Sequence, residues 1–350
     1  TVDYSISRLF LENLDHVLQG RALDYLIVNH MEPDHASVVE IIAQKYPEAT
    51  IVCNEKTVKM MKQFFTFEPE NRLHIVAEGD SLCTGRHELH FVMAPMVHWP
   101  EVMVTYDSTD KTLFSADAFG TFGTLDGKLF NDEFDFDRDL LDHARRYYTN
   151  IVGKYGNQVQ KLLKKASGLD IQRICPLHGP VWRSNLGYFI EKNNLWSSYQ
   201  YEKKGIVVIY ASMYGGTEAM AEAFAAKLND EGITEISVYD ASKTHPSYLI
   251  GEIFKYSHFV IASPTYNGNI HPVIETLLTD MNHLAVQNKT AVVMENGTWA
   301  PASGKKIKAA LEEMKNITVM EPTLSIKSVM KEDQLEAMDE LVKATAASLK

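Results

Sequence analysis

The first part of the chain alternates short apolar runs with segments of helical periodicity. Leu23–Asn29 and Thr50–Cys53 predict buried strands, and Ser37–Tyr46 and Lys56–Phe65 predict amphipathic helices. From residue 73 to residue 118 the pattern changes to short strands with little helical periodicity between them. Further elements are expected at Asp139–Val152 and Gln158–Ser167 (helices) and at Ile171–Cys175 (strand). Helices flanking many strands predict a layered α/β domain.

The second part of the chain is more regular, and a polar segment at residues 192–204 is interpreted as the linker before it. The predicted strands are Ile206–Ala211, Ile236–Tyr239, Phe259–Ala262, Ala291–Met294 and Leu324–Ile326. The predicted helices are Thr217–Leu228, Pro246–Lys255, Pro272–Met281, Lys305–Met314 and Glu332–Leu349. Five strands alternating with five helices predict a doubly wound parallel sheet.

Two domains are therefore expected, at residues 1–198 and 205–350, which fits a chain of 350 residues that is 45% hydrophobic. Thr1 is followed almost directly by a helix-like stretch (Ile6, Leu9, Phe10, Leu14). We therefore expect that the chain begins inside the first domain, with earlier strands missing or carried on another piece.

Charge and cysteine content narrow the class of protein. The net charge is −12 with no basic run, which argues against nucleic acid as a partner. No apolar stretch reaches membrane-spanning length, and no secretory signal is visible at the start. Cys53, Cys83 and Cys175 are widely separated and include no Cys-x-x-Cys pair. This pattern favours a reducing cytoplasm and offers no ligands for a rubredoxin or ferredoxin module.

The densest chemistry lies directly after the first predicted strand, where His30, Glu32, Asp34 and His35 place four potential metal ligands in six residues. Pro33 is expected to bar a regular helix here. A loop bent around a cation could then turn His30 and Glu32 one way and the other two side chains another way. A polar loop with one hydrogen-bonded histidine is the plain alternative.

Three further residues weaken that alternative. His98, Asp117 and His178 each follow a strand-like run, at the C-terminal strand ends where α/β folds place their sites. The histidines that lack such placement are interpreted as surface or core residues: His16, His74, His87, His90 and His143.

The donor set indicates the metal. Four imidazoles, three carboxylates and no thiolate are too many ligands for one tetrahedral ion, but two ions sharing a bridging carboxylate use them all. A hydrolytic dizinc site is usually richer in imidazole, and the harder oxygen ligands favour iron or manganese. We expect iron, with open positions that bind a small molecule between the metals.

The motif His-x-Glu-x-Asp-His followed by His98, Asp117 and His178 resembles the flavodiiron proteins. The related zinc hydrolases carry His-x-His-x-Asp-His, in which a histidine stands where this chain has Glu32. The resemblance implies a metallo-β-lactamase-like αββα domain with two iron ions. It assigns His30, Glu32 and His98 to the iron nearer the flavin, Asp34, His35 and His178 to the other iron, and Asp117 to a bridge between them.

A turn suited to phosphate opens the second domain, between its first strand and first helix. The turn comprises Ser212, Met213, Tyr214, Gly215, Gly216 and Thr217. It places backbone N–H groups at a helix N-terminus, and Ser212 and Thr217 supply hydroxyl donors. The turn is neither a P-loop nor a Gly-x-Gly-x-x-Gly dinucleotide turn.

Two more loops are expected at the same edge of the sheet. One comprises Ser263, Pro264, Thr265, Tyr266, Asn267 and Gly268, and the other Asn296, Gly297, Thr298 and Trp299. Each loop alone is an ordinary turn, but three loops around the switch point of a 2-1-3-4-5 sheet predict FMN as the ligand. This half is similar to flavodoxin, which assigns the loops to the phosphate and the isoalloxazine ring. Gly297 stands where relatives often have an aromatic residue, so Trp299 is expected to stack on the ring.

The resemblance also implies the reaction. The flavin accepts electrons from an external donor, with rubredoxin expected, and the di-iron site reduces O₂ to water or couples two NO molecules to N₂O. A head-to-tail homodimer, or a dimer of dimers, brings the flavin of one subunit beside the irons of the other. Trp99 and Tyr148 are candidates for tuning the choice of gas, although ordinary core aromatics are the simpler interpretation.

Two alternatives remain open at the level of sequence. One is a dizinc hydrolase with a flavodoxin-like electron-transfer domain, against which Glu32 argues. The other is a plain electron-transfer protein whose first domain is a structural remnant, against which the seven intact ligand positions argue.

Overall fold

The computed structural model describes residues 1–66 and 69–350, which pack as two compact units. The first unit comprises Thr1–Leu140 and Asn157–Glu191, and the second unit comprises Leu141–Gly156 and Lys192–Lys350. The expected division of the chain between residues 198 and 205 stays a prediction. Among the helices of the described ranges, none is both long and apolar enough to cross a bilayer.

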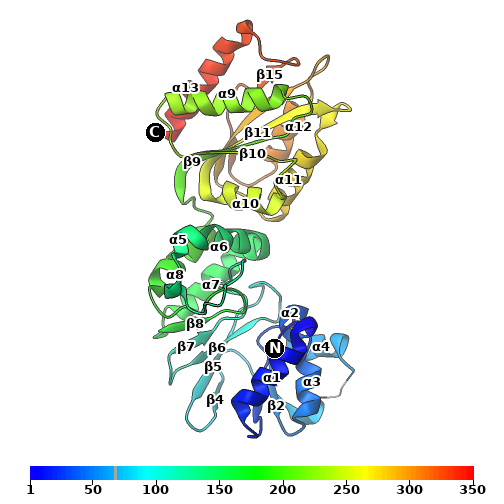
Figure 1. Cartoon of the computed structure of the whole chain (residues 1–350), viewed down its shortest axis with the longest axis vertical. Coiled ribbons are helices and arrows are strands. Elements are labelled where there is room, and N and C mark those ends of the chain that lie inside the picture. Colours follow the sequence, from blue (N-terminus) through cyan, green and yellow to red (C-terminus); the bar gives the residue numbers. More distant parts are fainter. Residues whose placement is uncertain (67–68) are drawn as a thin grey trace. The chain divides into compact units, whose positions relative to one another are not determined.

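The first unit contains two β-sheets (Figure 1). The smaller sheet is parallel, in the order β1 (Tyr25–Ile27), β2 (Thr50–Cys53), β3 (Leu73–Ile75). The larger sheet has the order β4 (Ser81–Cys83), β5 (Glu88–Met93), β6 (Met103–Asp107), β7 (Thr112–Phe114), β8 (Arg173–Cys175). Its pairs are antiparallel except for β7 and β8, which run parallel. The helices of this unit include α1 (Ser7–Leu18), α2 (Pro33–Ala36), α3 (Val39–Lys45), α4 (Glu55–Phe64), α5 (Phe136–Asp139) and α7 (Gly156–Ala166).

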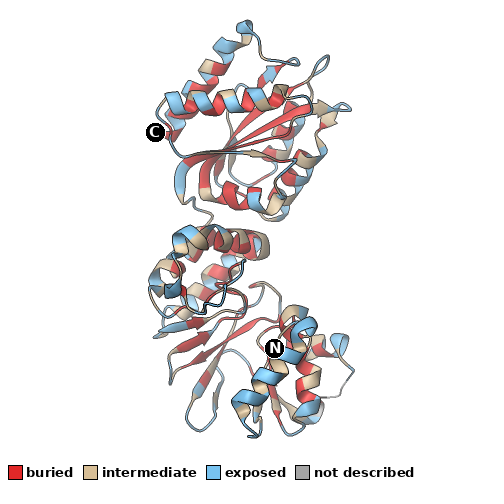
Figure 2. Cartoon of the chain, viewed as in Figure 1, coloured by how far each residue is buried: buried red, intermediate tan, exposed pale blue. Residues whose placement is uncertain are grey.

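Alternation along strand β2 explains the layering of the first unit. Ile51 and Cys53 point to a cluster formed with the apolar faces of α3 and α4. Val52, between them, packs instead with Phe91 and Met103 of the larger sheet. Successive strand residues point to opposite faces, so one short strand carries helices on one side and a second sheet on the other. This layering and the buried β2 (Figure 2) confirm the expected metallo-β-lactamase-like class.

The second unit contains the predicted doubly wound sheet. Its strand order is β10-β9-β11-β13-β14, with β15 also paired to β13, and this is the expected 2-1-3-4-5 arrangement. The parallel strands are β9 (Lys203–Tyr210), β10 (Ile236–Asp240), β11 (Tyr256–Tyr266), β13 (Lys289–Asn296), β14 (Ile317–Val319) and β15 (Leu324–Ile326). The main helices are α9 (Gly216–Asp230), α10 (Pro246–Lys255), α11 (Pro272–His283), α12 (Ser303–Glu312) and α13 (Leu335–Leu349).

Strand β9 shows why helices cover both faces of this sheet. Its residues alternate between two buried clusters, with Ile206 and Val208 in one and Val207 and Ile209 in the other. The first cluster includes residues of α9 and α13, and the second includes residues of α10, α11 and α12. A strand that is apolar on both faces is the pattern expected for a buried parallel sheet.

The predicted linker at residues 192–204 is longer than the connection in the structure, in which only residues 198–202 lie outside a helix or strand. Helix α8 (Leu186–Ser197) runs into this segment, and β9 already begins at Lys203. This mostly polar segment contains Trp196, which is fully buried. Its ring packs on Tyr148 at 5.5 Å between centroids, and its Nε1 donates to Glu202 Oε1 at 2.8 Å. One buried indole therefore makes this polar stretch part of the folded second unit.

The predicted single helix at Asp139–Val152 is also divided in the structure. The segment α6 (Leu141–Tyr147) continues into a π-helical turn, Tyr148–Val152. A π-helical turn shifts the later side chains relative to α-helical spacing. Periodicity in the sequence does not reveal such a shift.

The buried indole gives a stability prediction. We expect Trp196→Ala to lower the free energy of unfolding by about 3–5 kcal/mol, because it leaves a large cavity in the buried core. Trp299→Ala is the matched control, because the Trp299 side chain is 87% exposed, and we expect a change within about 0.5 kcal/mol. Denaturant unfolding of the cofactor-free variants measures both values. Equal effects of the two substitutions would contradict the integration of residues 192–197 into the second unit.

Candidate metal centre and flavin pocket

The ligand-rich segment after β1 adopts a short helix rather than the irregular loop that was expected. Glu32 is the extended residue before α2, and Pro33 occupies its first turn. The expectation that Pro33 bars a helix is wrong, because proline is tolerated at the first helical position, where its missing N–H has no intrahelical partner. As a result Glu32 precedes the helix, while Asp34 and His35 are inside its first turn.

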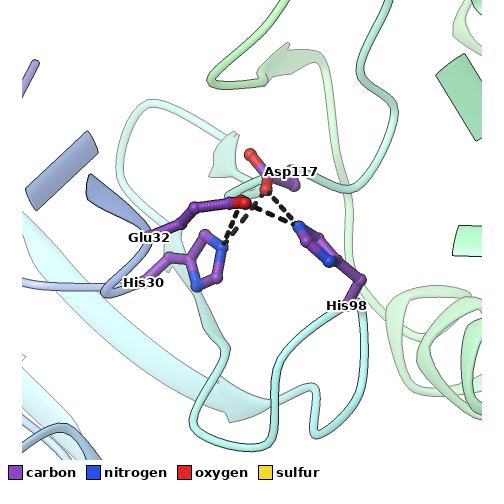
Figure 3. Close-up of side chains that lie close together, drawn as sticks. All are labelled: His30, Glu32, His98 and Asp117. Carbon is purple, nitrogen blue, oxygen red and sulfur yellow. Dashed lines mark hydrogen bonds and ion pairs between the residues drawn. The ribbon is translucent and has the colours of Figure 1, made fainter. Parts of the chain in front are cut away.

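Four of the predicted residues come together in a first cluster: His30, Glu32, His98 and Asp117 (Figure 3). Glu32 Oε2 lies 3.3 Å from His30 Nε2 and 2.9 Å from His98 Nε2. Asp117 Oδ2 lies 3.2 Å and 3.0 Å from the same two nitrogens. Two carboxylate oxygens and two imidazole nitrogens thus converge on one point, as the ligands of a metal ion do.

The other three predicted residues form a second cluster: Asp34, His35 and His178. Asp34 Oδ2 lies 3.1 Å from His35 Nε2 and 3.2 Å from His178 Nε2. The remaining oxygen of Asp117, Oδ1, lies 3.2 Å from His35 Nε2 and 3.7 Å from His178 Nε2. Asp117 therefore offers one oxygen to each cluster, which is the geometry of a bridging carboxylate.

The fold brings these segments together through the parallel pair β7 and β8. Asp117 follows β7 and is completely buried, and His178 follows β8, so both emerge from the same edge of the sheet. Gly179 has a φ of +86°, and a Cβ there would lie 2.7 Å from Thr121 Cβ. Glycine at this position therefore allows the His178 loop to approach the Asp117 loop closely.

In the first cluster, the histidines and the carboxylates shift each other's pKa values through hydrogen bonds. Burial lowers the pKa of His30, but hydrogen bonds with Asp117, Glu101 and Glu32 outweigh it and raise that pKa to about 11. Burial likewise opposes hydrogen bonds with Asp117 and Glu32 at His98, and the hydrogen bonds raise its pKa to about 9. Hydrogen bonds with His30 and His98 lower the pKa of Glu32 to about 2. When no cation is bound, the positive charge of the protonated histidines therefore compensates the negative charge of the carboxylates.

The pKa of Asp117, the carboxylate shared by the two clusters, is lowered like that of Glu32. Burial raises the pKa of Asp117, but hydrogen bonds with His30, His35 and His98 outweigh burial and hold it well below the usual range. In the second cluster, burial lowers the pKa of His178. A buried, ionised Asp117 requires positive charge on both of its sides.

The residues present fit a pair of metal ions. His35 Nε2 and His178 Nε2 face each other at 3.0 Å, so at most one hydrogen fits between two nitrogens that could each bind a cation. Asp34 Oδ1 is buried without a hydrogen-bond partner among the described residues. Four imidazoles and three carboxylates, with no thiolate, match the donor preference of iron.

A pocket of about 480 Å³ lies at the carboxyl edge of the second unit's sheet, where the sequence predicts the flavin. The three expected loops line most of it, through Ser212, Met213, Tyr214, Gly216, Thr217, Pro264, Thr265, Tyr266, Asn267, Gly268, Asn296, Gly297, Thr298 and Trp299. Gly215 and Ser263 are not among the lining residues. Gly215 forms the left-handed residue before α9, and the Ser263 hydroxyl accepts from His271 N at 3.2 Å.

The second of these loops is a β-hairpin. Strand β11 runs to Tyr266 and pairs with the short β12 (Asn269–Ile270) through Asn267 and Gly268. Both turn residues have positive φ, 48° and 72°, which is typical of the Asn-Gly hairpin turn. The third predicted strand was therefore too short, because the Asn-Gly signal was interpreted as an irregular loop.

A fourth segment lines the pocket and has no counterpart in the sequence prediction: Ser328 and Val329, with Ala300 beside the third loop. The Asn296 side chain holds this segment by donating to Ser328 O at 3.0 Å and accepting from Ser328 N at 2.9 Å. A Cβ on Gly216 would lie 2.0 Å from Ser328 O, so only glycine fits there. Ser328 follows β15 at the edge of the sheet that carries the other loops. Its position after a predicted strand could therefore have identified it from the sequence.

Of the two aromatic residues that were candidates for tuning the choice of gas, the structure places one beside the first cluster. The Trp99 ring meets the His30 ring edge-on at 5.4 Å and the His98 ring at 6.3 Å. Tyr148 belongs to the second unit, where it is buried against Trp196. Tyr148 therefore fits the simpler interpretation of a core aromatic.

Both halves of the chain match known families. Residues 5–179 match the family described as ODP family beta lactamase, and residues 208–341 match flavodoxin. The anaerobic nitric oxide reductase flavorubredoxin of Klebsiella pneumoniae subsp. pneumoniae is 30% identical over 342 residues, which are 95% of this chain and 68% of that protein. An uncharacterised protein of Methanocaldococcus jannaschii is 30% identical over 344 residues, 98% of this chain and 86% of its own length.

Solved structures agree with these matches. The rubredoxin oxygen:oxidoreductase from the anaerobe Desulfovibrio gigas superposes with a TM-score of 0.92 at 26% identity. The flavodiiron protein from Giardia intestinalis gives a TM-score of 0.92 at 27% identity, and each comparison covers 100% of this chain and 86% of the other. Fold and site thus define a class in which a β-lactamase-type metal domain is joined to a flavodoxin domain. The chain belongs to the flavodiiron protein family.

The raised pKa values of His30 and His98 predict how pH acts on stability. In the metal-free protein the raised pKa values of His30 and His98 stabilise the fold fully below the ordinary value of 6.5, and this contribution is lost as pH rises through about 9 and about 11. Metal-bound histidines are neutral, so the metal-loaded protein lacks this loss. We expect the melting temperature of the metal-free protein to fall between pH 6.5 and about 9, and its difference from the loaded protein to widen.

Calorimetry of both forms across this range measures the difference. His98→Gln is the control, because it removes the group with the lower of the two raised pKa values and should flatten the decline. A metal-free melting temperature that stays constant or rises with pH in the unsubstituted protein would contradict the described charge balance.

Proposed function

We propose that the protein is an oxidoreductase that binds FMN and two iron ions and reduces O₂ to water, NO to N₂O, or both. An external donor such as rubredoxin supplies the electrons. The observation that carries this proposal is Asp117, which is fully buried and offers one oxygen to each of two ligand clusters. The names of the similar proteins, a nitric oxide reductase flavorubredoxin and a rubredoxin oxygen:oxidoreductase, support both gases and the donor.

The seven side chains are proposed as ligands in two sets. His30, Glu32 and His98 would hold one iron, Asp34, His35 and His178 the other, and Asp117 would bridge. When bound, the irons and the flavin supply the redox chemistry, and the chain supplies ligands, orientation and charge. Glu32 favours iron over the zinc of a hydrolase, because it replaces an imidazole by a hard oxygen donor.

The electron count of the reaction fits this cofactor set. Reduction of O₂ to two waters consumes four electrons and four protons. That count equals the two electrons of a fully reduced flavin plus one from each ferrous ion. Coupling of two NO molecules to N₂O and water consumes two electrons and two protons, which half of the same store covers.

Within the flavin pocket, the proposed roles follow from position. The segment at residues 212–217 leads into the first turn of α9, whose N-terminus suits the phosphate. The hairpin, the third loop and the Ser328 segment line the remaining volume, where the isoalloxazine ring would lie. Trp299, 87% exposed, remains the proposed stacking residue.

Anaerobic reduction of metal-analysed protein, followed by separate exposure to O₂ and to NO, tests the function. We expect the reduced flavin to be reoxidised by at least one gas. Protein with Asp117→Ala should be reoxidised at least about 100-fold more slowly, because both clusters lose a ligand. If iron- and flavin-loaded protein is reoxidised by neither gas, the proposal fails. Zinc in place of iron, together with ester or thioester hydrolysis, would support the hydrolase alternative instead.

We also propose a head-to-tail homodimer, alone or as a dimer of dimers, in a cytoplasmic setting. The exposed aromatic rim of the flavin pocket supports a protein partner there, because Tyr214 is 95% and Trp299 87% exposed. The three cysteines are free thiols, and this supports a reducing compartment.

Complementation between inactive subunits tests this arrangement. Gly216→Val should lose FMN, because its side chain meets Ser328 O, and Asp117→Ala should lose iron. Each variant should keep its other cofactor, which shows that it is folded. Random mixing should restore about a quarter of the normal rate, because half of the dimers are mixed and each has one intact pair across the interface. Absence of recovery in mixed dimers would contradict the head-to-tail arrangement.

A further inference from the structure

Glu101 is a buried carboxylate beside the first cluster that the ligand motif does not include. It lies in the turn between His98 and strand β6, and it is 1% exposed. Burying a carboxylate costs free energy unless hydrogen bonds or a nearby positive charge compensate for it. Its surroundings therefore indicate what it does.

Three contacts fix the position of Glu101. Its Oε1 accepts from His30 Nδ1 at 2.7 Å and from Met31 N at 2.9 Å. Its backbone carbonyl accepts from Asn54 Nδ2 at 2.6 Å. Asn54 in turn caps helix α4 by accepting from Lys56 N and Thr57 N. Glu101 is therefore held between the ligand-bearing segment, through its carboxylate, and the start of a helix, through its backbone.

The contact with His30 determines which nitrogen of that ring can bind a metal. A carboxylate accepts but does not donate, so His30 carries its hydrogen on Nδ1. When the ring is neutral, as a metal ligand must be, Nε2 then keeps its lone pair, and Nε2 is the atom that faces Glu32 Oε2 at 3.3 Å and Asp117 Oδ2 at 3.2 Å. In the opposite tautomer Nε2 would carry a hydrogen and could not be a ligand.

The second oxygen of Glu101 adds a further observation. Oε2 is buried and has no hydrogen-bond partner among the described residues. Part of the negative charge of Glu101 is therefore not dispersed by hydrogen bonds, and it lies next to a ring that points at the first cluster. Positive charge at that cluster is the nearest compensation.

We propose that Glu101 is a positioning residue that holds His30 in its metal-binding tautomer and strengthens metal binding at the first cluster selectively. This inference rests on the proposed metal centre but not on its reaction. A carboxylate behind a histidine ligand fixes the ring and raises its basicity, and loss of such a partner typically costs about 10–100-fold in metal affinity. The second cluster has no contact with Glu101 in the described structure, so its affinity should not change.

Cobalt(II) titration of the metal-free protein, followed by ligand-field absorption, tests this selectivity. The unsubstituted protein should bind two ions. Glu101→Gln keeps the shape and an accepting oxygen but removes the charge, and Glu101→Leu removes the acceptor as well. We expect the affinity of one site to fall about tenfold for the Gln variant and about 100-fold for the Leu variant, with the other site unchanged. The absorption band of the weakened site should also shift.

A second pair in the same chain provides the control. Asp107 Oδ2 contacts His87 Nδ1 at the same 2.7 Å, outside the two clusters. Asp107→Asn should leave the affinities and spectra of the two clusters unchanged, although it removes a carboxylate from a histidine contact of the same length. Asp107 also groups with His87 and Asp110 as possible ligands, so any cobalt bound there would be lost as a separate, third signal.

The possible outcomes distinguish the role of Glu101 from the existence of the metal centre. If Glu101→Gln binds both ions with unchanged affinity and spectrum, the role of Glu101 is disproved. If both sites weaken equally, Glu101 is only a structural residue, and the inference is again overturned. If the unsubstituted protein binds fewer than two ions, the proposed metal centre itself fails. Should the Leu variant not fold, the isosteric Gln variant still decides the question.

Discussion

The structure of the first unit depends on one buried carboxylate, Asp117, being shared between two groups of histidines. A fully buried carboxylate is stable only beside positive charge, and here three imidazoles approach it within 3.2 Å. Protons can supply that charge, but protons and metal ions compete for the same nitrogens. The charge that the fold has buried therefore favours cations at this site, and in the proposed function two metal ions take the place of these protons.

Both candidate sites use the same rule of sheet geometry. Parallel strands end at a common edge, so residues far apart in the sequence meet there without long loops. The parallel pair β7 and β8 brings Asp117 and His178 together in the first unit. In the second unit the ends of β9, β11, β13 and β15 carry the pocket-lining segments. In each site a glycine allows two of these segments to approach closely: Gly179 lies against Thr121, and Gly216 lies against Ser328.

The sequence predicts what is local and periodic. Strand-like and helical segments in alternation predicted the second sheet, the flavodoxin-like fold type supplied its strand order, and position after strands indicated seven donors that the structure brings into two clusters. Tertiary features escaped prediction. Pro33 lies at the first position of a helix, where proline is tolerated, but the sequence does not show where that helix begins. Trp196 is buried although the residues around it in the sequence are polar. Glu101 and Ser328 lie outside any motif, because their roles arise from contacts with His30 and Asn296 that only the folded chain creates.

The central claim is that Asp117 joins two iron ions, one in each cluster. Crystals of iron-loaded protein, measured with X-rays on either side of the iron and zinc absorption edges, test it most directly. The account predicts two anomalous peaks that appear at the iron edge, one beside each oxygen of Asp117, with His30 and His98 at one peak and His35 and His178 at the other. A single peak, or peaks that appear only at the zinc edge, would contradict it.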